Sequence, residues 1–174
     1  MSLPARTAKE ALEEYKDLNQ APLSCVHRTA FWRFAHPSKH VLQIEPDGLR
    51  LTGARCSPVY VSALQEVEPV KNEDGWGIKV LRYSYIVSPS ERMKPELVAW
   101  QWHPEVTNIH GEEETCPHVH LGWPCCTVKS FHKLLVPTSR VGFEHVAWFL
   151  LNQLQVEALR PFDMKVLVLP GQYE

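Results

Sequence analysis

The segment WGIKVLRYSYIV, residues 76–87, is the longest strand candidate in the chain and decides the expected fold class. Side chains of a strand alternate between two faces, which gives two sets: Val80, Arg82, Ser84 and Ile86 on one face, and Leu81, Tyr83, Tyr85 and Val87 on the other. LVAWQWH, residues 97–103, follows after a loop and is expected to pair antiparallel with it. An antiparallel sheet is therefore expected around these two segments.

Further regions are expected to supply strands to the same sheet. Residues 26–34 are rich in aromatic and β-branched side chains, as strands are. Residues 40–44 and 49–52 flank the turn EPDG and predict a hairpin, because proline presets one turn angle and glycine supplies the positive φ. The other candidates are residues 58–64, 119–121 and 131–136, so the sheet region spans residues 25–136.

The first helix is expected close to the start of the chain. Thr7 and Glu10 have the spacing of a capping box, in which each side chain bonds the backbone amide of the other residue. Ala8, Leu12 and Tyr15 recur at helical spacing, so a helix is predicted over residues 8–19. Pro22 prevents it from continuing far, since proline lacks the amide hydrogen that a helix interior needs.

The second helix is expected near the other end. An apolar stripe predicts it over residues 143–155, although Gly142 is a weaker N-cap than serine or aspartate. A tail, residues 160–174, contains an apolar run at 164–169 that suits an edge strand or a partner-facing segment. The order of elements predicts one α+β domain, residues 1–174, with a curved, mainly antiparallel sheet packed against both helices.

The composition is that of a globular protein. Of 174 residues, 44% are hydrophobic and 22% charged, which argues against disorder. A net charge of -2 provides no overall attraction to nucleic acid or to an anionic membrane, so any RNA binding requires a local basic patch. The start of the chain shows no signal peptide, and no apolar run has the length of a membrane span. Five cysteines, an odd number, suggest reduced thiols and a cytoplasmic protein.

The strongest local signal for a site is the sequence His118-Val119-His120. Residues two apart in a strand project from the same face, so the two imidazoles are expected side by side. His103 and His132 lie on two other predicted strands, and they converge with the pair if those strands are neighbours.

Three interpretations of this cluster remain open. Two histidines suit general acid–base catalysis of phosphodiester cleavage without a metal, with Arg140 or Lys133 stabilising the developing negative charge. Three imidazoles suit zinc with one open position. Alternatively, the rings are structural and bond backbone carbonyls.

Two further interpretations concern cysteines and aromatic residues. The Cys116–Cys126 region contains no C-x2-C pair, so its signal for structural zinc is weak, and we expect no cofactor. Tyr83, Trp102 and their aromatic neighbours are able to stack RNA bases, although such residues more often form core. P-loop, GxGxxG, nucleophile-elbow and HExxH motifs are not found, which disfavours nucleotide-dependent, triad-hydrolase and zinc-protease chemistry.

Four short motifs occur in a characteristic order: Tyr83-x-Tyr85, the WQWHPE of residues 100–105, the PHVH of residues 117–120 and the PTSRV of residues 137–141. Together they resemble the TumE-type toxins of bacterial toxin–antitoxin systems and related uncharacterised small bacterial proteins. The resemblance covers roughly residues 78–159, and His103, His118, His120 and Arg140 match its pattern. Gly142 departs from it, because a helix-capping serine is usual there, and residues 123–126 have no counterpart.

The resemblance implies an α+β toxin that acts on RNA or translation and is encoded beside an antitoxin. Combined with the histidines, it gives the leading hypothesis: a metal-independent ribonuclease with His118 and His120 as acid and base, His132 or His103 orienting them, and Arg140 on the phosphate. Tyr83, Trp102, His103 and Lys133 are the expected substrate-binding residues. The alternative is a non-catalytic interaction protein with structural histidines, in which the aromatic face and the tail bind a protein partner.

Overall fold

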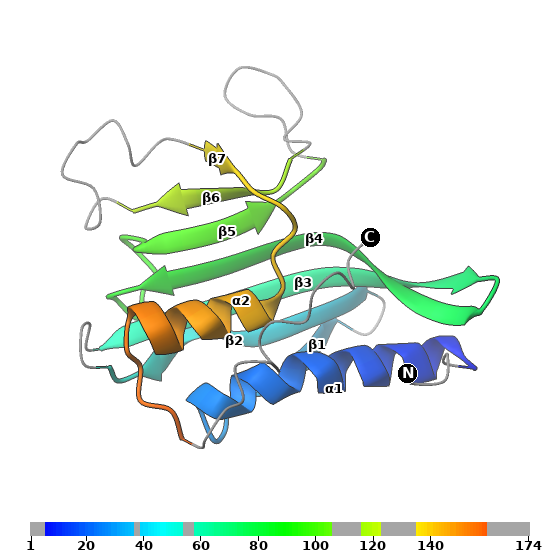
Figure 1. Cartoon of the computed structure of the whole chain (residues 1–174), viewed down its shortest axis with the longest axis horizontal. Helices are drawn as coiled ribbons and strands as arrows, with labels where there is room; N and C mark the ends of the chain where they lie inside the picture. The colour runs from blue at the N-terminus through cyan, green and yellow to red at the C-terminus, as the bar shows by residue number, and fades with distance from the viewer. Residues whose placement is uncertain (1–5, 37–38, 54–57, 106–115, 123–134, 160–174) are drawn as a thin grey trace.

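The computed structural model describes residues 6–36, 39–53, 58–105, 116–122 and 135–159. Helix α1 comes first, seven strands follow, and a short helical segment closes the described chain (Figure 1). The expected α+β class is thus confirmed. The bounds are α1 Ala8–Val26, β1 Arg33–His36, β2 Lys39–Leu51, β3 Val59–Asn72, β4 Gly75–Ser88, β5 Val98–Trp102, β6 His118–Leu121, β7 Leu135–Pro137, α2 Phe143–Trp148 and the π-helical η3 Phe149–Gln153.

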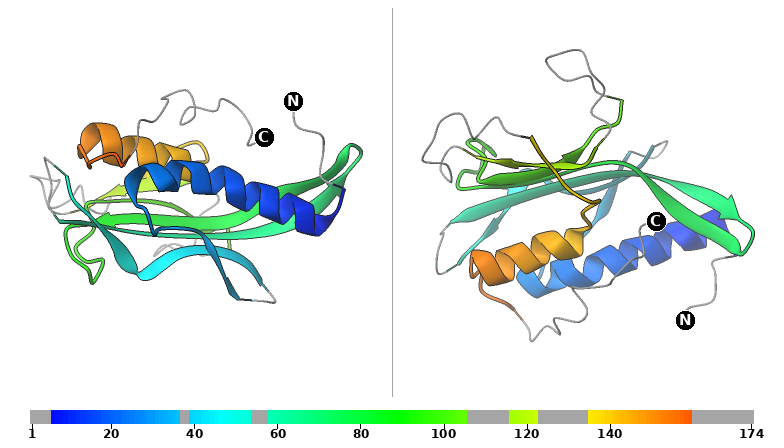
Figure 2. Two further views of the ribbon diagram at one scale, coloured as in Figure 1. Left: turned by 90° about the horizontal axis from the view of Figure 1, so that it is seen from below. Right: turned by 45° about the horizontal axis from the view of Figure 1, so that its top comes forward.

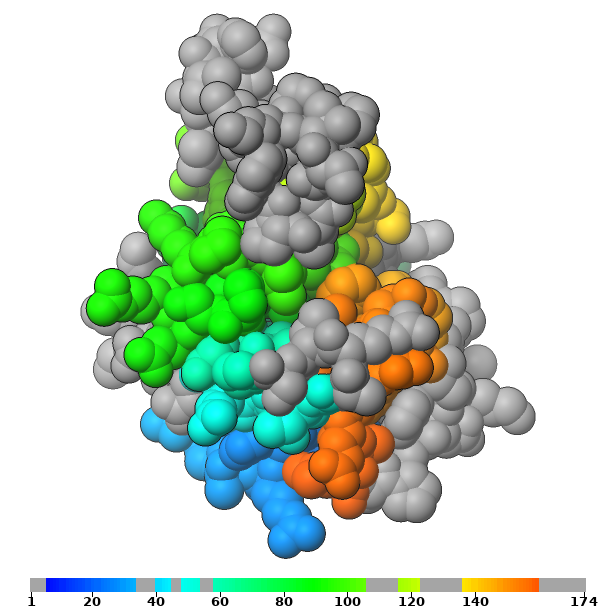
Figure 3. All heavy atoms as spheres, turned by 90° about the vertical axis from the view of Figure 1, so that its left-hand side faces the viewer, coloured from blue at the N-terminus to red at the C-terminus, as the bar shows by residue number. Residues whose placement is uncertain are grey.

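The strands form one sheet in which spatial order follows chain order, β1 to β7, and each described pair of neighbours is antiparallel. Both helices lie on the same side of this curved sheet (Figure 2). Seen from one end, the C-terminal helical segment packs beside the end of α1 and against the strands (Figure 3). The molecule therefore has two layers, helices on sheet.

The register divides the sheet into two faces, because directly paired residues project from the same side. Tyr83 pairs with Trp102 and Tyr85 with Trp100, and this side packs against the helices. We call it the helix face. Ser84 pairs with Gln101 on the opposite side, which we call the open face.

A bulge in β4 changes which residues join the core. Glu66 pairs with Arg82, whereas the next residue of β3, Val67, pairs with Val80, so Leu81 is an extra residue in β4. A bulge shifts the alternation by one position. Val80 is consequently buried with Tyr83 on the helix face, and the prediction that it faces the same way as Arg82 was wrong.

The predicted hairpin around EPDG was also wrong. β2 is one strand whose two halves both pair with β3, through Ile44 with Ala63 before the irregularity and Leu49 with Val61 after it. The turn residues therefore loop out of a continuing strand instead of reversing it. The physical reason is burial, because Ile44 and Leu49 are both in the core.

Helix α1 begins with the predicted capping box: the Glu10 amide donates to Thr7 Oγ1 at 3.2 Å, and the Thr7 amide to Glu10 Oε2 at 3.0 Å. It does not end near Pro22, as predicted, but continues through it to Val26. Proline costs one backbone hydrogen bond there, and the burial of Leu23 and Val26 beyond it offsets the loss. The strand predicted from residue 26 accordingly begins only at Arg33.

The other predicted elements differ from the structure mainly at their ends. β3 extends to Asn72, and β7 spans Leu135–Pro137; residues 131–134 of the strand predicted there lie outside the described residues. The predicted helix over residues 143–155 is present as α2 and η3, ending at Gln153. The apolar run at 164–169 lies outside the described residues.

A buried polar chain links α1 to the sheet. The Tyr15 hydroxyl donates to Gln65 Oε1 at 3.2 Å, and Gln65 Nε2 donates to the Tyr85 hydroxyl. Gln65 is 2% exposed, so the cost of burying its amide is met by these partners. The chain fixes the position of α1 over β3 and β4.

The carboxylate of Glu144 is buried at the start of α2 and lies close to Gly142. A Cβ at Gly142 would overlap this carboxylate, so the Glu144 side chain would have to shift. A carboxylate at this end of a helix is stabilised by the helix dipole. Nδ1 of His145 lies 3.0 Å from Glu144 Oε1, and this hydrogen bond raises the pKa of His145 although burial opposes the shift.

This pair predicts pH-dependent stability. Because the pKa of His145 is higher in the folded state, its contribution is fully present below the ordinary histidine value of 6.5 and is lost as pH rises through the folded pKa. Urea unfolding of the wild type and of Glu144→Gln, between pH 5.5 and 8.5, should show a free-energy difference that shrinks toward high pH. A difference that stays constant over this range would contradict the assignment.

Candidate functional site on the open face

His118 and His120 lie side by side, as their spacing predicts. In β6 they pair with Gln101 and Ala99 of β5, and their ring centroids are 4.8 Å apart at an interplanar angle of 54°. Val119, between them, points the other way and packs against the core. The two imidazoles therefore share the open face of the sheet, on the side opposite the helices.

One nitrogen of His118 has a defined role. His118 is 4% exposed, and its Nδ1 lies 3.1 Å from the carbonyl oxygen of Cys116. A carbonyl only accepts hydrogen bonds, so Nδ1 carries the hydrogen and donates it. In the neutral ring Nε2 is then the lone-pair nitrogen, the tautomer a general base requires. This atom, like Nε2 of His120, is itself buried, so the neighbouring side chains have to move before a substrate reaches either ring. His120, in the same strand, is half-buried.

His103 belongs to the same face. It follows β5 two residues beyond Gln101, and it lines a pocket of about 250 Å³ together with Glu66, Leu81, Arg82, Pro104 and Glu105. Glu66 and Arg82 form an ion pair across β3 and β4, with side chains 17% and 46% exposed. Arg82 thus places a guanidinium on the face that carries the histidines.

A polar row connects this pocket to the histidine pair. Ser84, Gln101 and His118 are successive partners on three adjacent strands, and Gln101 Nε2 donates to Ser84 Oγ at 3.4 Å. We call the continuous group the open-face strip; it comprises Glu66, Arg82, Ser84, Gln101, His103, His118 and His120. It combines imidazoles, a carboxylate, a guanidinium, a hydroxyl and an amide, which are groups suited to proton transfer and to binding polar ligands.

Arg140, Tyr83 and Trp102 form a separate group on the helix face. Cζ of Arg140 lies 4.4 Å from the centroid of the Trp102 ring, a cation–π contact. The Tyr83 hydroxyl accepts a 3.1 Å hydrogen bond from the Val141 amide. Burial raises the pKa of Tyr83, while that hydrogen bond and the charge of Arg140 act in the opposite direction. The sheet separates this group from the histidine pair, so the structure does not bring Arg140 to the imidazoles.

The contacts of Tyr83, Trp102 and Arg140 hold the segment between β7 and α2 in place, which is a structural role. Tyr83→Phe removes the acceptor of the Val141 amide and should lower the free energy of unfolding by about 1 kcal/mol. Urea unfolding measures it, with Tyr60→Phe, a half-buried tyrosine of the open face, as the matched control. Equal stability of Tyr83→Phe and the wild type would contradict this assignment.

Two predicted site residues, His132 and Lys133, lie outside the described residues. Within the described ranges, no three histidine, cysteine, aspartate or glutamate side chains converge as metal ligands would. The thiols described are those of buried Cys25 and exposed Cys116. In the same part of the chain, no helix has the length and apolar character needed to cross a membrane.

Glu66 was not among the predicted site residues. It lies far from the histidines in the chain, and only the pairing of β3 with β4 brings it to the strip. The sequence signal for Glu66 is the alternation of β3, in which every second side chain is buried and Glu66 occupies one of the positions between them. No protein-family model, curated protein or solved structure matches this chain.

Proposed function

We propose that the open-face strip cleaves RNA by acid–base catalysis, with His118 and His120 as the proton-transfer pair. The observation that carries the proposal is the 4.8 Å separation of their rings on a face that neither α1 nor α2 covers. Paired imidazoles able to exchange protons with one substrate suit phosphodiester transesterification.

The proposed reaction needs no group beyond those of the substrate and the two rings. One imidazole takes the proton of a ribose 2′-hydroxyl, the 2′-oxygen bonds to phosphorus, and the other imidazole protonates the departing 5′-oxygen. The products are a 2′,3′-cyclic phosphate and a 5′-hydroxyl end. Arg140, the predicted phosphate-binding residue, lies against Trp102 on the helix face and does not take part in this step.

The resemblance to TumE-type toxins supports a biological setting for this activity. In that setting the protein inhibits growth by acting on cellular RNA, and a cognate antitoxin protein restrains it. The negative net charge fits brief contact with RNA better than stable nucleic-acid binding.

The test is an RNA cleavage assay with purified protein, with and without a chelator. The expected result is cleavage that the chelator leaves unchanged and that 2′-O-methylated RNA of the same sequence abolishes, because the attacking oxygen is blocked. Cleavage of the 2′-O-methylated strand, or none of either strand, would contradict the proposal.

A second function, an interaction protein with structural histidines, is favoured by one observation. His118 is almost fully buried and bonds a backbone carbonyl, as a structural histidine does. Leu121 and Val136, 43% and 45% exposed near the β7 end of the sheet, would then contribute to a protein-binding surface. Under this reading His118→Ala destabilises the protein, and no RNA cleavage is found in any variant.

A further inference from the structure

The pocket lined by Glu66, Arg82 and His103 has the size of a small planar group. Its volume of about 250 Å³ lies below the range of roughly 300–1,000 Å³ for drug-sized ligands. It therefore suits one nucleobase and excludes a dinucleotide. Leu81 and Pro104 provide apolar walls, and His103 provides a ring of the kind on which unpaired RNA bases stack.

The charges of the pocket favour a base over a phosphate. Two carboxylates, Glu66 and Glu105, line it against one guanidinium, Arg82. A phosphate would meet repulsion from both carboxylates, whereas a ligand carrying N–H donors would be attracted by them. The pocket thus requires a ligand with donors for Glu66 and an acceptor for Arg82.

Guanine meets this requirement. Its Watson–Crick edge presents adjacent N1–H and N2–H donors, which one carboxylate can accept together, and beside them the O6 acceptor, which arginine recognises. The ion pair of Glu66 and Arg82 places a carboxylate and a guanidinium next to each other in the wall of the pocket. One carboxylate contact does not exhaust the five N–H donors of a guanidinium. Adenine, cytosine and uracil do not have two adjacent donors followed by an acceptor on this edge.

The pocket is separated from the histidine pair by the width of several strands. Glu66 is two residues along β3 from Leu64, and Leu64, Ser84, Gln101 and His118 are successive partners on four neighbouring strands, so Glu66 and His118 are about 16 Å apart. This is more than the span of one nucleotide. We propose that the pocket binds a guanine base of the RNA and thereby selects which phosphodiester bond, a few nucleotides away, is presented to His118 and His120; this inference rests on the proposed function.

The binding experiment uses the wild-type protein and the four ribonucleoside monophosphates as probes, followed by calorimetric titration. GMP should bind at least about tenfold more tightly than AMP, CMP or UMP, since one good bidentate contact discriminates by about 1–3 kcal/mol. Inosine monophosphate, which lacks the N2 amino group, should bind more weakly than GMP. These comparisons need no variant and so do not depend on any substitution folding.

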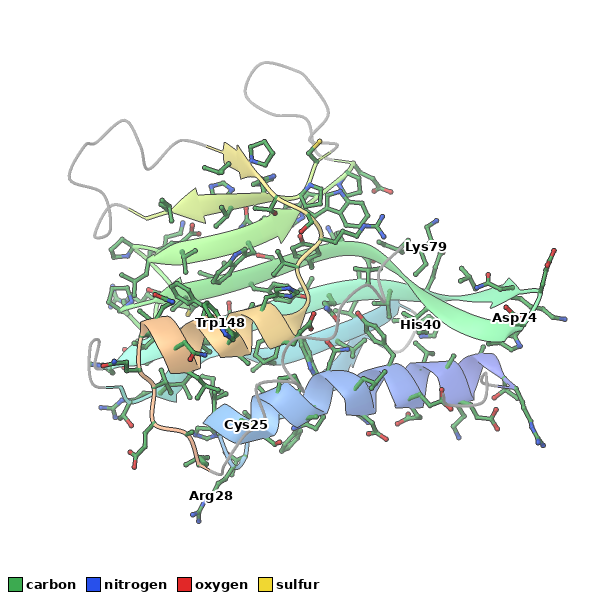
Figure 4. All side chains as sticks on the ribbon, in the orientation of Figure 1. Cys25, Arg28, His40, Asp74, Lys79 and Trp148 are labelled. Atoms are coloured by element: carbon green, nitrogen blue, oxygen red, sulfur yellow. The ribbon has the colours of Figure 1, made fainter. Side chains whose placement is uncertain are left out.

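Glu66→Gln should remove the preference for GMP, because an amide nitrogen then opposes the base donors. The matched control is Glu68→Gln. Glu68 lies two residues further along β3, on the same face, and pairs with Lys79 of β4 at 3.2 Å, toward the hairpin end of that strand (Figure 4). It does not line the pocket, so this variant should keep the preference.

The outcomes separate the two proposals. GMP preference in the wild type and in Glu68→Gln, lost in Glu66→Gln, supports the guanine site. Equal binding of all four monophosphates, or no binding of GMP, overturns it. RNA cleavage without preference for guanine positions would overturn this inference and leave the proposed catalysis standing. GMP binding without RNA cleavage would leave the guanine site standing and overturn the catalysis.

Discussion

His120→Ala should lower the rate of RNA cleavage by about 10²–10⁴-fold, the range by which a positioned acid or base accelerates such reactions. The residue is half-buried and pairs with Ala99 through backbone atoms, which alanine preserves. The loss should therefore appear in kcat, with little change in the thermal unfolding midpoint. Cleavage rates of wild type and variant on one oligoribonucleotide, together with circular dichroism, measure both.

The matched control for this prediction is His27→Ala. His27 follows α1, outside the open-face strip, and its Nδ1 accepts a bond from the Thr29 amide at 3.2 Å. Cleavage should be unchanged in this variant. A fully active His120→Ala protein, or an equal loss in both variants, would show that the His118–His120 pair does not transfer the proton.

Gly122→Ala should be the most destabilising small substitution near the site. A Cβ at this position would overlap the carbonyl oxygen of Glu96, and the Gly122 amide donates to the Leu97 carbonyl at 2.8 Å. Since both neighbours are backbone atoms, β6 must move away from β5. The expected loss is about 3 kcal/mol, which lowers Tm by roughly 6–12 °C in a chain of this size.

Gly77→Ala is the control for the backbone overlap. A Cβ there would lie 3.5 Å from Asn72 Nδ2, an ordinary contact, so its Tm should stay close to that of the wild type. Gly122→Ala should also reduce cleavage, because displacing β6 moves both imidazoles. Equal melting temperatures for the two variants would mean that β6 does not lie where the structure places it.

Local patterns predicted much of this fold. The capping box of Thr7 and Glu10 and the strand alternation of β5 and of β4 from Arg82 onward depend on residues close in sequence, and both were found. The irregularities in β2 and at Leu81 were not predicted, because a bulge is defined by the partner strand. The length of α1 was missed for a similar reason, since the core contacts of Leu23 outweigh the local effect of Pro22.

The site residues likewise differ in whether local sequence could predict their positions. The same-face arrangement of His118 and His120 follows from a period of two within four residues, so it could be predicted. The face reached by Arg140 depends on how the chain leaves β7, and only the structure shows it over Trp102. Glu66 belongs to the open-face strip because β3 pairs with β4 in a register that places it opposite Arg82, and a short sequence motif cannot predict that register.

The most direct test of the central claim is the chemistry of the 3′ ends that the wild-type protein produces from a defined oligoribonucleotide. Transfer of a proton from the 2′-hydroxyl to one imidazole, and from the other to the 5′-oxygen, predicts 2′,3′-cyclic phosphate ends, which mass spectrometry identifies. Ends bearing a 3′-hydroxyl would show that water, and not the 2′-oxygen, attacks phosphorus, and would contradict catalysis by the His118–His120 pair as described.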